Sequence, residues 1–349
     1  MSATSAQFED INFLETKLNS GSLPKDLFEK AKADIERLVR LASSKGYGEE
    51  YDAVSRYLDW VVSLPWSVRS KDVLSLDNAK KVLDSNHYGL ENIKERILEF
   101  VSVANLRSAA GQESNSPAIL LLGLVGTGKT TMAYSIAQAL GRKFGRIPMG
   151  GMGDAAQLRG RSRAHPDAEP GQIVKVLRRV QTKNPVILLD EIDRVTEEAK
   201  ADIMGVLVEL LDPEQNSAYI DHYIDYPFDL SEVLFITTAN NTGGIATAVL
   251  DRLEVIEMPS YTDQQKIIIA KDYLLPRALS ASGLAAGDVV IEDKVWSHIV
   301  RPLGFDAGMR TLDRTIKAIC RKVAKLKLEE KVSKAAITEA NYKEYLLSY

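Results

Sequence analysis

The segment GLVGTGKT, residues 123–130, follows the apolar run AILLLG and precedes a stretch with helical periodicity. It matches the pattern G-x-x-x-x-G-K-[ST], in which small residues let backbone N–H groups wrap around phosphate oxygens. In this pattern Lys129 would reach the β- and γ-phosphates of a nucleotide, and the Thr130 hydroxyl would bind Mg²⁺. A Gly-rich turn that arose by chance is the alternative, and the strand and helix on either side argue against it.

The phosphate-binding segment is expected to extend one residue into the following helix. It comprises Gly123, Leu124, Val125, Gly126, Thr127, Gly128, Lys129, Thr130 and Thr131.

Two further apolar runs end in polar residues that suit the same site. In VILLDEID, residues 186–193, a buried strand would bring Asp190 and Glu191 to the carboxyl edge of a sheet. We expect Asp190 to hold Mg²⁺ through water and Glu191 to activate the attacking water. In FITTANN, residues 235–241, Asn240 would orient that water from beside Glu191. An acidic pair on the surface and a turn asparagine are the alternative interpretations.

The order of helical and apolar segments predicts an α/β fold. AILLLG at 118–123, NPVILLD at 184–190 and VLFITTA at 233–239 have the length and character of buried strands in a parallel sheet, and helical patterns separate them. Before them, residues 23–43 and 49–66 predict two antiparallel helices, and residues 76–109 predict a helix split at NHYG. After EVIEMPSYTD we predict helices to the end of the chain.

Composition argues against several classes of protein. The 349 residues are 45% apolar and 26% charged, as in ordinary soluble domains, and a net charge of −4 disfavours nucleic-acid binding. The single cysteine, Cys320, leaves no disulfide within the chain, fits a reducing compartment, and lies in a helical pattern that predicts a buried thiol. The sequence has no uninterrupted run of 18 apolar residues, so we predict no membrane span. The N-terminus resembles neither a signal peptide nor a mitochondrial presequence. We therefore expect a cytoplasmic location.

On these residues the chain resembles the ATPase part of a Lon protease, a member of the AAA+ ATPases. The resemblance extends from about residue 23 to the end and is carried by YLDWVVSLPW, HYGLENIKERILEFVSV, KNPVILLDEID, LVELLDPEQNSAYIDHYIDYPFDLSEVLFITTANN, AVLDRLEVIEMPSYTDQQKIIIAKDYLLP and GMRTLDR. It implies a P-loop AAA+ sheet sandwiched by helices at residues 71–262, after an N-terminal helical hairpin at 1–70 and before an α-helical lid at 263–349. It also implies binding and hydrolysis of ATP with Mg²⁺, and protein substrates that are unfolded or translocated.

The resemblance gives roles to four further residues. Arg252 in VLDRLEV corresponds to an arginine finger offered to the neighbouring subunit's nucleotide, and Arg310 in GMRTLDR corresponds to the sensor-2 arginine that reaches the γ-phosphate. His87 and Tyr88 lie in HYG, which is similar to the segment beside the adenine. From the local sequence alone, each arginine could equally well be a solvated charge on the surface. An arginine supplied in trans implies a ring, by resemblance a hexamer. The family also leaves the mitochondrial matrix as an alternative location.

The chain departs from the family at its end and in its P-loop. The sequence stops at Tyr349, where the family's lid ends, so we expect a motor without a Ser–Lys peptidase domain of its own, acting alone or with a full-length Lon-type protease. Leu124 and Val125 stand where the family usually has two prolines. Loss of prolines frees the unbound loop, so we expect weaker nucleotide binding without its loss.

The segment GGMGDAAQLRGRSRAHPDAEPGQI, residues 150–173, is the larger departure, because it occupies the place of the family's first pore loop. Aligned on RG and PG, the aromatic and aliphatic positions that grip substrate hold His165 and Pro166, followed by the acidic turn DAE. We expect Tyr219 in a second loop to contact substrate still. The polar tip supports an alternative function, an ATP-dependent regulatory or scaffold subunit that assembles with a nucleotide but translocates nothing.

Overall fold

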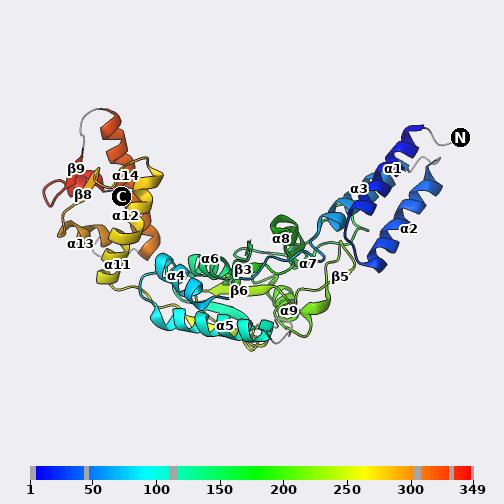
Figure 1. The fold of residues 1–349 in the computed structure, drawn as a ribbon, viewed down its shortest axis with the longest axis horizontal. Coiled ribbons are helices and arrows are strands. Elements are labelled where there is room, and N and C mark those ends of the chain that lie inside the picture. The colour runs from blue at the N-terminus through cyan, green and yellow to red at the C-terminus, as the bar shows by residue number, and fades with distance from the viewer. Residues whose placement is uncertain (1–4, 43–46, 110–116, 302–307, 330–333, 347–349) are drawn as a thin grey trace.

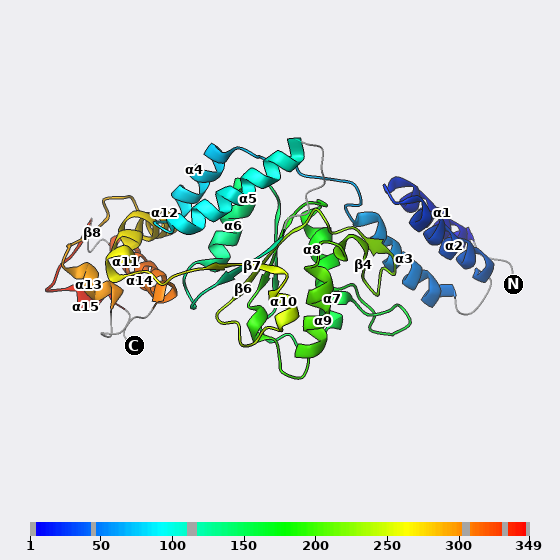
Figure 2. The same cartoon turned by 90° about the horizontal axis from the view of Figure 1, so that it is seen from below.

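The computed structural model describes residues 5–42, 47–109, 117–301, 308–329 and 334–346. Figures 1 and 2 show an elongated chain with helices of the N-terminal part at one end, a sheet with covering helices in the middle, and a C-terminal helical group at the other end. No helix in these ranges is long and apolar enough to cross a membrane.

Five parallel strands form the central sheet, in the order β2-β3-β6-β1-β7. Their bounds are β1 (Ala118–Leu122), β2 (Phe144–Pro148), β3 (Val186–Asp190), β6 (Leu234–Ala239) and β7 (Leu253–Glu257). The three predicted runs are β1, β3 and β6, which fill the middle of the sheet. The sequence missed β2 and β7 because they are the edge strands, and their sequences FGRIP and LEVIE carry charges that face solvent.

Successive side chains of each strand enter two different cores. Ile119 and Leu121 pack with α4 (Leu76–Asn86), α5 (Glu91–Ala109) and α6 (Lys129–Ala139), whereas Leu120 packs on the other face with α8 (Gln172–Val180) and α9 (Lys200–Leu210). Figure 2 shows these two groups of helices on opposite sides of the strands. Because both faces are covered, functional groups are left to the loops at the strand ends.

Three helices form the N-terminal end of the molecule. The predicted pair is α2 (Lys25–Leu41) and α3 (Tyr47–Ser63), and α1 (Ser5–Ser20) packs against both. The sequence missed α1, in which the positions described as buried are Ile11, Leu14 and Leu18 and alternate with exposed and charged residues. The last turns of α3 bury Tyr57 and Val61 in the core of the sheet, so this helix joins the two units.

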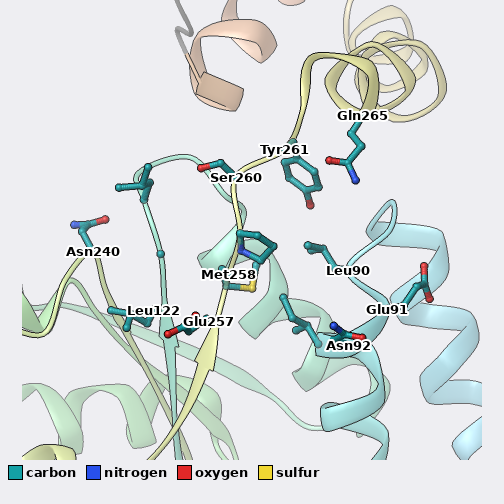
Figure 3. A pocket seen from close by; sticks show the side chains of 14 residues that line it. Leu90, Glu91, Asn92, Leu122, Asn240, Glu257, Met258, Ser260, Tyr261 and Gln265 are labelled. Carbon is teal, nitrogen blue, oxygen red and sulfur yellow. The ribbon is translucent and has the colours of Figure 1, made fainter.

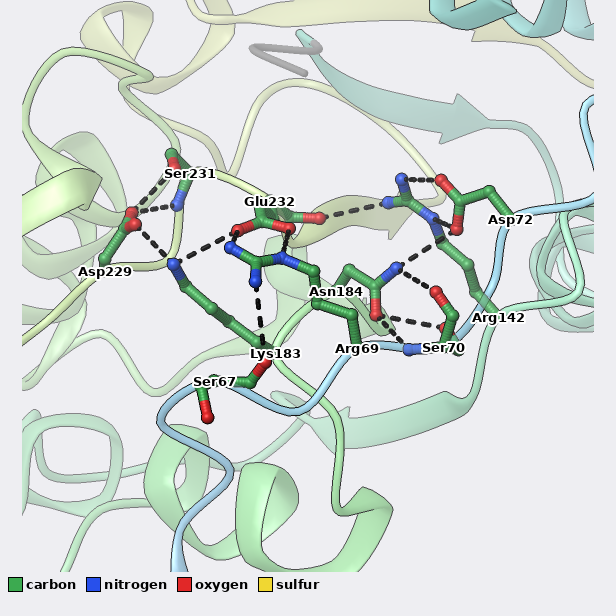
Figure 4. Close-up of polar contacts among 10 residues, drawn as sticks. All are labelled: Ser67, Arg69, Ser70, Asp72, Arg142, Lys183, Asn184, Asp229, Ser231 and Glu232. Atoms are coloured by element: carbon green, nitrogen blue, oxygen red, sulfur yellow. Dashed lines mark hydrogen bonds and ion pairs between the residues drawn. The ribbon is translucent and has the colours of Figure 1, made fainter. Parts of the chain in front are cut away.

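A polar network fastens the segment after α3 to the amino ends of β2, β3 and β6 (Figure 4). Arg142 pairs with Asp72 at 2.6 Å, and its Nη1 donates to the carbonyl oxygen of Glu232 at 3.0 Å. The Glu232 carboxylate accepts from Arg69 and pairs with Lys183 at 3.1 Å. The Arg142 side chain is only 7% exposed, so removal of Asp72 alone would leave an uncompensated buried charge. This network lies at the edge opposite the P-loop.

The C-terminal group is built from α11 (Asp263–Ile269), a π-helical turn η3 (Ala270–Leu274), α12 (Leu275–Ala281), α13 (Val295–Val300), α14 (Gly308–Leu328) and α15 (Tyr342–Tyr345). The prediction of helices alone is wrong here, because β8 (Val289–Ile291) pairs in parallel with β9 (Ala335–Ile337). Strands of three residues are too short to show an alternating pattern. Cys320 is buried in this group, as predicted.

The remaining elements are short connections. They are α7 (Ala156–Arg159), η1 (Ile192–Arg194), η2 (Asn216–Ala218), β4 (Tyr219–Ile220), β5 (Pro227–Phe228) and α10 (Thr247–Leu250).

Candidate nucleotide site

The P-loop has the backbone conformation that its glycines allow. Gly126 and Gly128 adopt φ values of +87° and +95°, a region that side chains disfavour, and Lys129 then begins α6. A Cβ on Gly123 would lie 2.4 Å from the carbonyl oxygen of Met258, which leaves no room for any other residue. The loop therefore exposes backbone N–H groups at the amino end of a helix, where anions bind.

The Lys129 ammonium group is buried beneath this loop. Its Nζ donates to the carbonyl oxygens of Gly123 at 2.5 Å and Leu124 at 3.0 Å, and to Asn240 Oδ1 at 3.1 Å. Burial lowers the Lys129 pKa, and the nearby carboxylates, Asp193 first, oppose that shift. The lysine is thus held in place by acceptors that a phosphate oxygen can replace.

Asp190 ends β3 and is only 4% exposed. Its Oδ1 accepts from Thr238 Oγ1 at 2.6 Å and lies 3.5 Å from Thr130 Oγ1, while Oδ2 pairs with Arg146 Nη2 at 2.6 Å. Oxygen donors of this kind suit Mg²⁺, which keeps waters and takes few protein ligands. The described residues contain no group of three or more His, Cys, Asp and Glu side chains that would hold a metal. Thr130 and Asp190 would therefore hold Mg²⁺ together with phosphates and water.

Glu191 follows in a strained backbone conformation. Its φ of +62° lies in the left-handed region, which is uncommon outside glycine and costs about 1–3 kcal/mol. Its N–H donates to Thr238 Oγ1 at 2.8 Å, which fixes the turn into η1. A Cβ on Gly150 would lie 3.0 Å from Glu191 Oε2, so this glycine leaves room for the carboxylate. Glu191 lines a cavity between the P-loop and the C-terminal group.

That cavity has a volume of ≈ 350 Å³ and brings together most of the predicted residues. It is lined by His87, Tyr88, residues 125–131, Asp190, Glu191, Asn240 and Arg310. Cations and N–H groups stand at the P-loop, and Ile269, Tyr273 and Leu274 of the C-terminal group offer apolar surface. A triphosphate with an attached base matches this division of chemistry.

His87 lies in the wall of the cavity with a perturbed proton affinity. Its side chain is 5% exposed, and Nε2 lies 2.9 Å from Ser135 Oγ. Burial, together with the nearby cations Lys94 and Arg277, lowers the His87 pKa to about 4. His87 is thus neutral at pH 7 and presents an uncharged ring beside Tyr88.

Gly123 and Leu124 line a second hollow on the other side of the P-loop, of ≈ 810 Å³. Figure 3 shows Leu90 and Asn92 at the start of α5 across from Met258 and Tyr261, with Asn240 at the margin. Of the residues predicted to be catalytic, only Asn240 reaches this hollow. The smaller cavity is therefore the candidate nucleotide site.

Arg252 lies outside both hollows, just before β7. Its Nε and Nη2 bind Asp212 Oδ2 at 3.1 and 3.0 Å, and Nη1 donates to the carbonyl oxygen of Ala248 at 2.8 Å. The chain therefore does not bring Arg252 to its own P-loop.

Comparison with known proteins agrees with this geometry. Residues 119–261 match the model of the ATPase family associated with various cellular activities (AAA), and residues 280–336 match the Lon protease AAA+ ATPase lid domain. "Lon protease 2" of Herpetosiphon aurantiacus is 41% identical over 337 residues, and the "Lon protease" of Dictyoglomus thermophilum is 42% identical over 330 residues. These alignments cover 97% and 95% of this chain and 41% of each relative.

The chain belongs to the Lon protease family in its AAA+ part. It spans about two fifths of the length of the Lon proteases it matches. The fold is the predicted one, a P-loop NTPase sheet flanked by helices with a Lon-type lid after it.

The segment between α7 and α8, which we expect to correspond to the family's first pore loop, is tethered and its tip is exposed. Arg163 Nη1 lies 3.2 Å from Asp34 Oδ2 of α2, and its guanidinium lies 3.8 Å from the centre of the Tyr57 ring of α3. His165 and Pro166 are exposed. The polar tip is thus held beside the N-terminal helices.

The expectation that Tyr219 contacts substrate is wrong for this chain. Its ring is fully buried, and its hydroxyl donates to the carbonyl oxygen of Leu158 at 3.1 Å. A two-residue strand points its side chains to opposite sides, and Tyr219 is the inward one. Ile220, the next residue of this hairpin, is 42% exposed.

Sequence reasoning missed three residues of the site, namely Arg146, Thr238 and Asp193. Arg146 lies on the unpredicted strand β2, so no motif pointed to it. Thr238 precedes Asn240 within FITTANN, and its buried hydroxyl links Asp190 to the Glu191 backbone. Asp193 is the last residue of VILLDEID, and its carboxylate accepts the Asn240 N–H at 3.0 Å. Thr238 and Asp193 lie within two residues of the predicted residues Asn240 and Glu191 in the sequence, and this closeness is the signal that could have identified them.

Proposed function

We propose that this chain binds ATP with Mg²⁺ in the cavity beside the P-loop, hydrolyses it, and couples hydrolysis to the movement of protein substrates. One observation carries the proposal. Lys129, Asp190, Glu191 and Asn240 follow or end three different strands, β1, β3 and β6, and line one cavity at the carboxyl edge of the sheet. Phosphoryl transfer needs such a set, namely a cation for the phosphates, a Mg²⁺ ligand and groups that position water.

Each residue has a role that its position allows. Glu191 would take the proton of the attacking water, and Asn240 would orient that water. Lys129 would leave its carbonyl acceptors for the β- and γ-phosphates, while Thr130 and Asp190 would hold Mg²⁺, whose charge offsets that of the phosphates. Arg310, on α14 of the lid, faces the P-loop: a Cβ on Gly126 would lie 3.9 Å from Arg310 Cγ. Lid movement would thereby change the contacts of the γ-phosphate.

We further propose a homo-oligomeric ring, a hexamer by family resemblance, in which Arg252 acts on the neighbouring subunit's nucleotide. The ion pair with Asp212 supports this role, because it presents Arg252 at a distance from the chain's own cavity. An arginine supplied in trans can raise phosphoryl transfer by about 10³–10⁵-fold.

A regulatory or scaffold subunit, alone or with a full-length Lon-type protease, is the second candidate function. The observations that favour it are the exposed polar tip at His165 and Pro166, its tether through Arg163, and the burial of Tyr219. Such a subunit would assemble with a nucleotide without pulling on a polypeptide.

The steady ATPase rate with and without a permanently unfolded protein tests these alternatives. A motor predicts a rate that rises several-fold with the unfolded protein, and a further rise when His165→Tyr and Pro166→Ile restore an apolar tip. Arg179→Ala, on the exposed face of α8, is the matched control and should behave as the wild type. An ATPase that ignores the unfolded protein in every variant contradicts the motor and supports the scaffold.

A further inference from the structure

Asp193 joins the ends of two neighbouring strands inside the site. It stands in η1, after β3, and its Oδ2 accepts the backbone N–H of Asn240, the first residue after β6, at 3.0 Å. The chain beyond Asn240 returns to the same place, since a Cβ on Gly244 would lie 2.6 Å from the carbonyl oxygen of Asp193. Asp193 is thus in contact with both ends of the segment that carries Asn240.

Two buried polar atoms at this contact lack partners. Asp193 Oδ1 and Asn240 Nδ2 are each buried without a hydrogen bond to any described residue. One is an acceptor and the other a donor, on two residues that are already hydrogen-bonded through the backbone. Buried polar atoms are rarely left unpaired, because the loss of hydration is not repaid.

Lys129 explains why the two atoms remain apart. Its ammonium donates to Asn240 Oδ1 at 3.1 Å, and this contact orients the amide group of Asn240 toward the P-loop. A phosphate that takes Lys129 away would release Asn240 Oδ1. The Asn240 amide would then be free to turn its NH₂ group toward the unpaired oxygen of Asp193.

We propose that Asp193 is a positioning residue for ATP hydrolysis, which holds Asn240 at its backbone at all times and at its side-chain NH₂ once phosphate has drawn Lys129 away. This inference rests on the proposed ATPase function. Asp193 would make the orientation of Asn240 depend on whether phosphate has bound Lys129. The amide oxygen of Asn240 would then face the attacking water only when ATP occupies the site. Asp193 acts through Asn240 and touches no reacting atom.

A double-mutant cycle tests whether Asp193 acts through Asn240. We expect Asp193→Ala to lower kcat about tenfold, because a hydrogen bond with a charged acceptor is lost, while the ATP dissociation constant stays within about twofold. Asp193→Asn keeps one acceptor oxygen and should lose less. Asp193→Ala combined with Asn240→Ala should be no slower than Asn240→Ala alone. Asp202→Asn, on the exposed surface of α9, is the control.

Additive losses in the double variant, or a kcat for Asp193→Ala equal to that of the wild type, would overturn the proposal. Hydrogen–deuterium exchange of the peptide around Asn240 provides a readout that does not need turnover. The exchange rate of this peptide should rise in Asp193→Ala and stay unchanged in Asp202→Asn. An unchanged rate in Asp193→Ala would contradict the proposal that Asp193 holds the backbone of Asn240. A wild type that binds but does not hydrolyse ATP contradicts the proposed function instead, and the exchange measurement still decides the role of Asp193.

Discussion

At the scale of single residues, burial decides the chemistry of the site more than residue type does. His87 faces Ser135 in the cavity wall, and its surroundings lower its pKa from 6.5 to about 4. Lys129 is pushed in the same direction by burial, but three carboxylates counter the shift. The nucleotide cavity therefore keeps a neutral ring at one end and a cation at the other.

The first prediction concerns the His87 titration. Among the four histidines of the chain, one imidazole signal in an NMR titration should show a pKa near 4 and should vanish in His87→Gln. Because the pKa is lower in the folded than in the unfolded chain, His87 contributes stability above about pH 6.5, and this contribution is lost as the pH falls toward 4. The loss amounts to about 3 kcal/mol. A His87 signal that titrates near pH 6.5 would show that the ring is not buried as described.

At the scale of elements, the loop at residues 160–171 is attached to the N-terminal helices. Arg163 is its attachment, through the ion pair with Asp34 of α2 and its stacking on Tyr57 of α3. A cation over an aromatic ring contributes about 0.5–2 kcal/mol, and the ion pair adds to it. The N-terminal helices thereby limit where the polar tip can go.

The second prediction follows from this attachment. Arg163→Ala should make the loop several-fold more sensitive to a protease that cleaves after Asp and Glu, at Asp167 and Glu169, while the melting temperature changes by only a few degrees. Arg179→Ala removes a similar charge from the exposed side of α8 and serves as the control. Equal cleavage rates in the two variants would mean that Arg163 does not hold the loop.

The elements also show how far the sequence could predict the molecule. The strands β1, β3 and β6 were predicted because covering helices bury both faces and most of their positions are apolar. The edge strands β2 and β7 and the three-residue strands β8 and β9 carry no such pattern. The P-loop and VILLDEID were found because phosphate binding restricts backbone and side chains within one short segment.

Other features of the site depend on which strands lie side by side. Arg146 on β2 reaches Asp190 on β3, and Thr238 on β6 reaches both Asp190 and Glu191. These partners are far apart in sequence and follow from the strand order, which the periodicity does not determine. The error at Tyr219 has the same origin, because its burial depends on packing beneath Leu158. The division at residues 70 and 262 remains a prediction.

At the scale of the whole molecule, we propose that a complete site needs two copies of the chain, because Arg252 pairs with Asp212 and lies outside the chain's own cavity. The third prediction mixes two inactive variants. The Arg252→Ala subunit retains an intact Glu191, and the Glu191→Gln subunit retains an intact Arg252 that can act on the neighbouring subunit's nucleotide. Equal mixing should restore activity to about a quarter of the wild-type rate, because one interface in four then pairs an intact Glu191 with an intact Arg252. Mixtures that stay inactive although the subunits exchange would show that Arg252 does not act across the interface.

We propose that Glu191 activates the attacking water for ATP hydrolysis in the cavity that contains Lys129. The most direct test is the steady rate of phosphate release by the wild type and by Glu191→Gln at saturating ATP, with ATP binding measured on the same samples. We expect the variant to bind ATP as tightly as the wild type and to release phosphate at least about 100-fold more slowly, because a general base is lost. A Glu191→Gln variant that hydrolyses ATP at the wild-type rate, or a wild type that binds ATP without hydrolysing it, would contradict this role of Glu191.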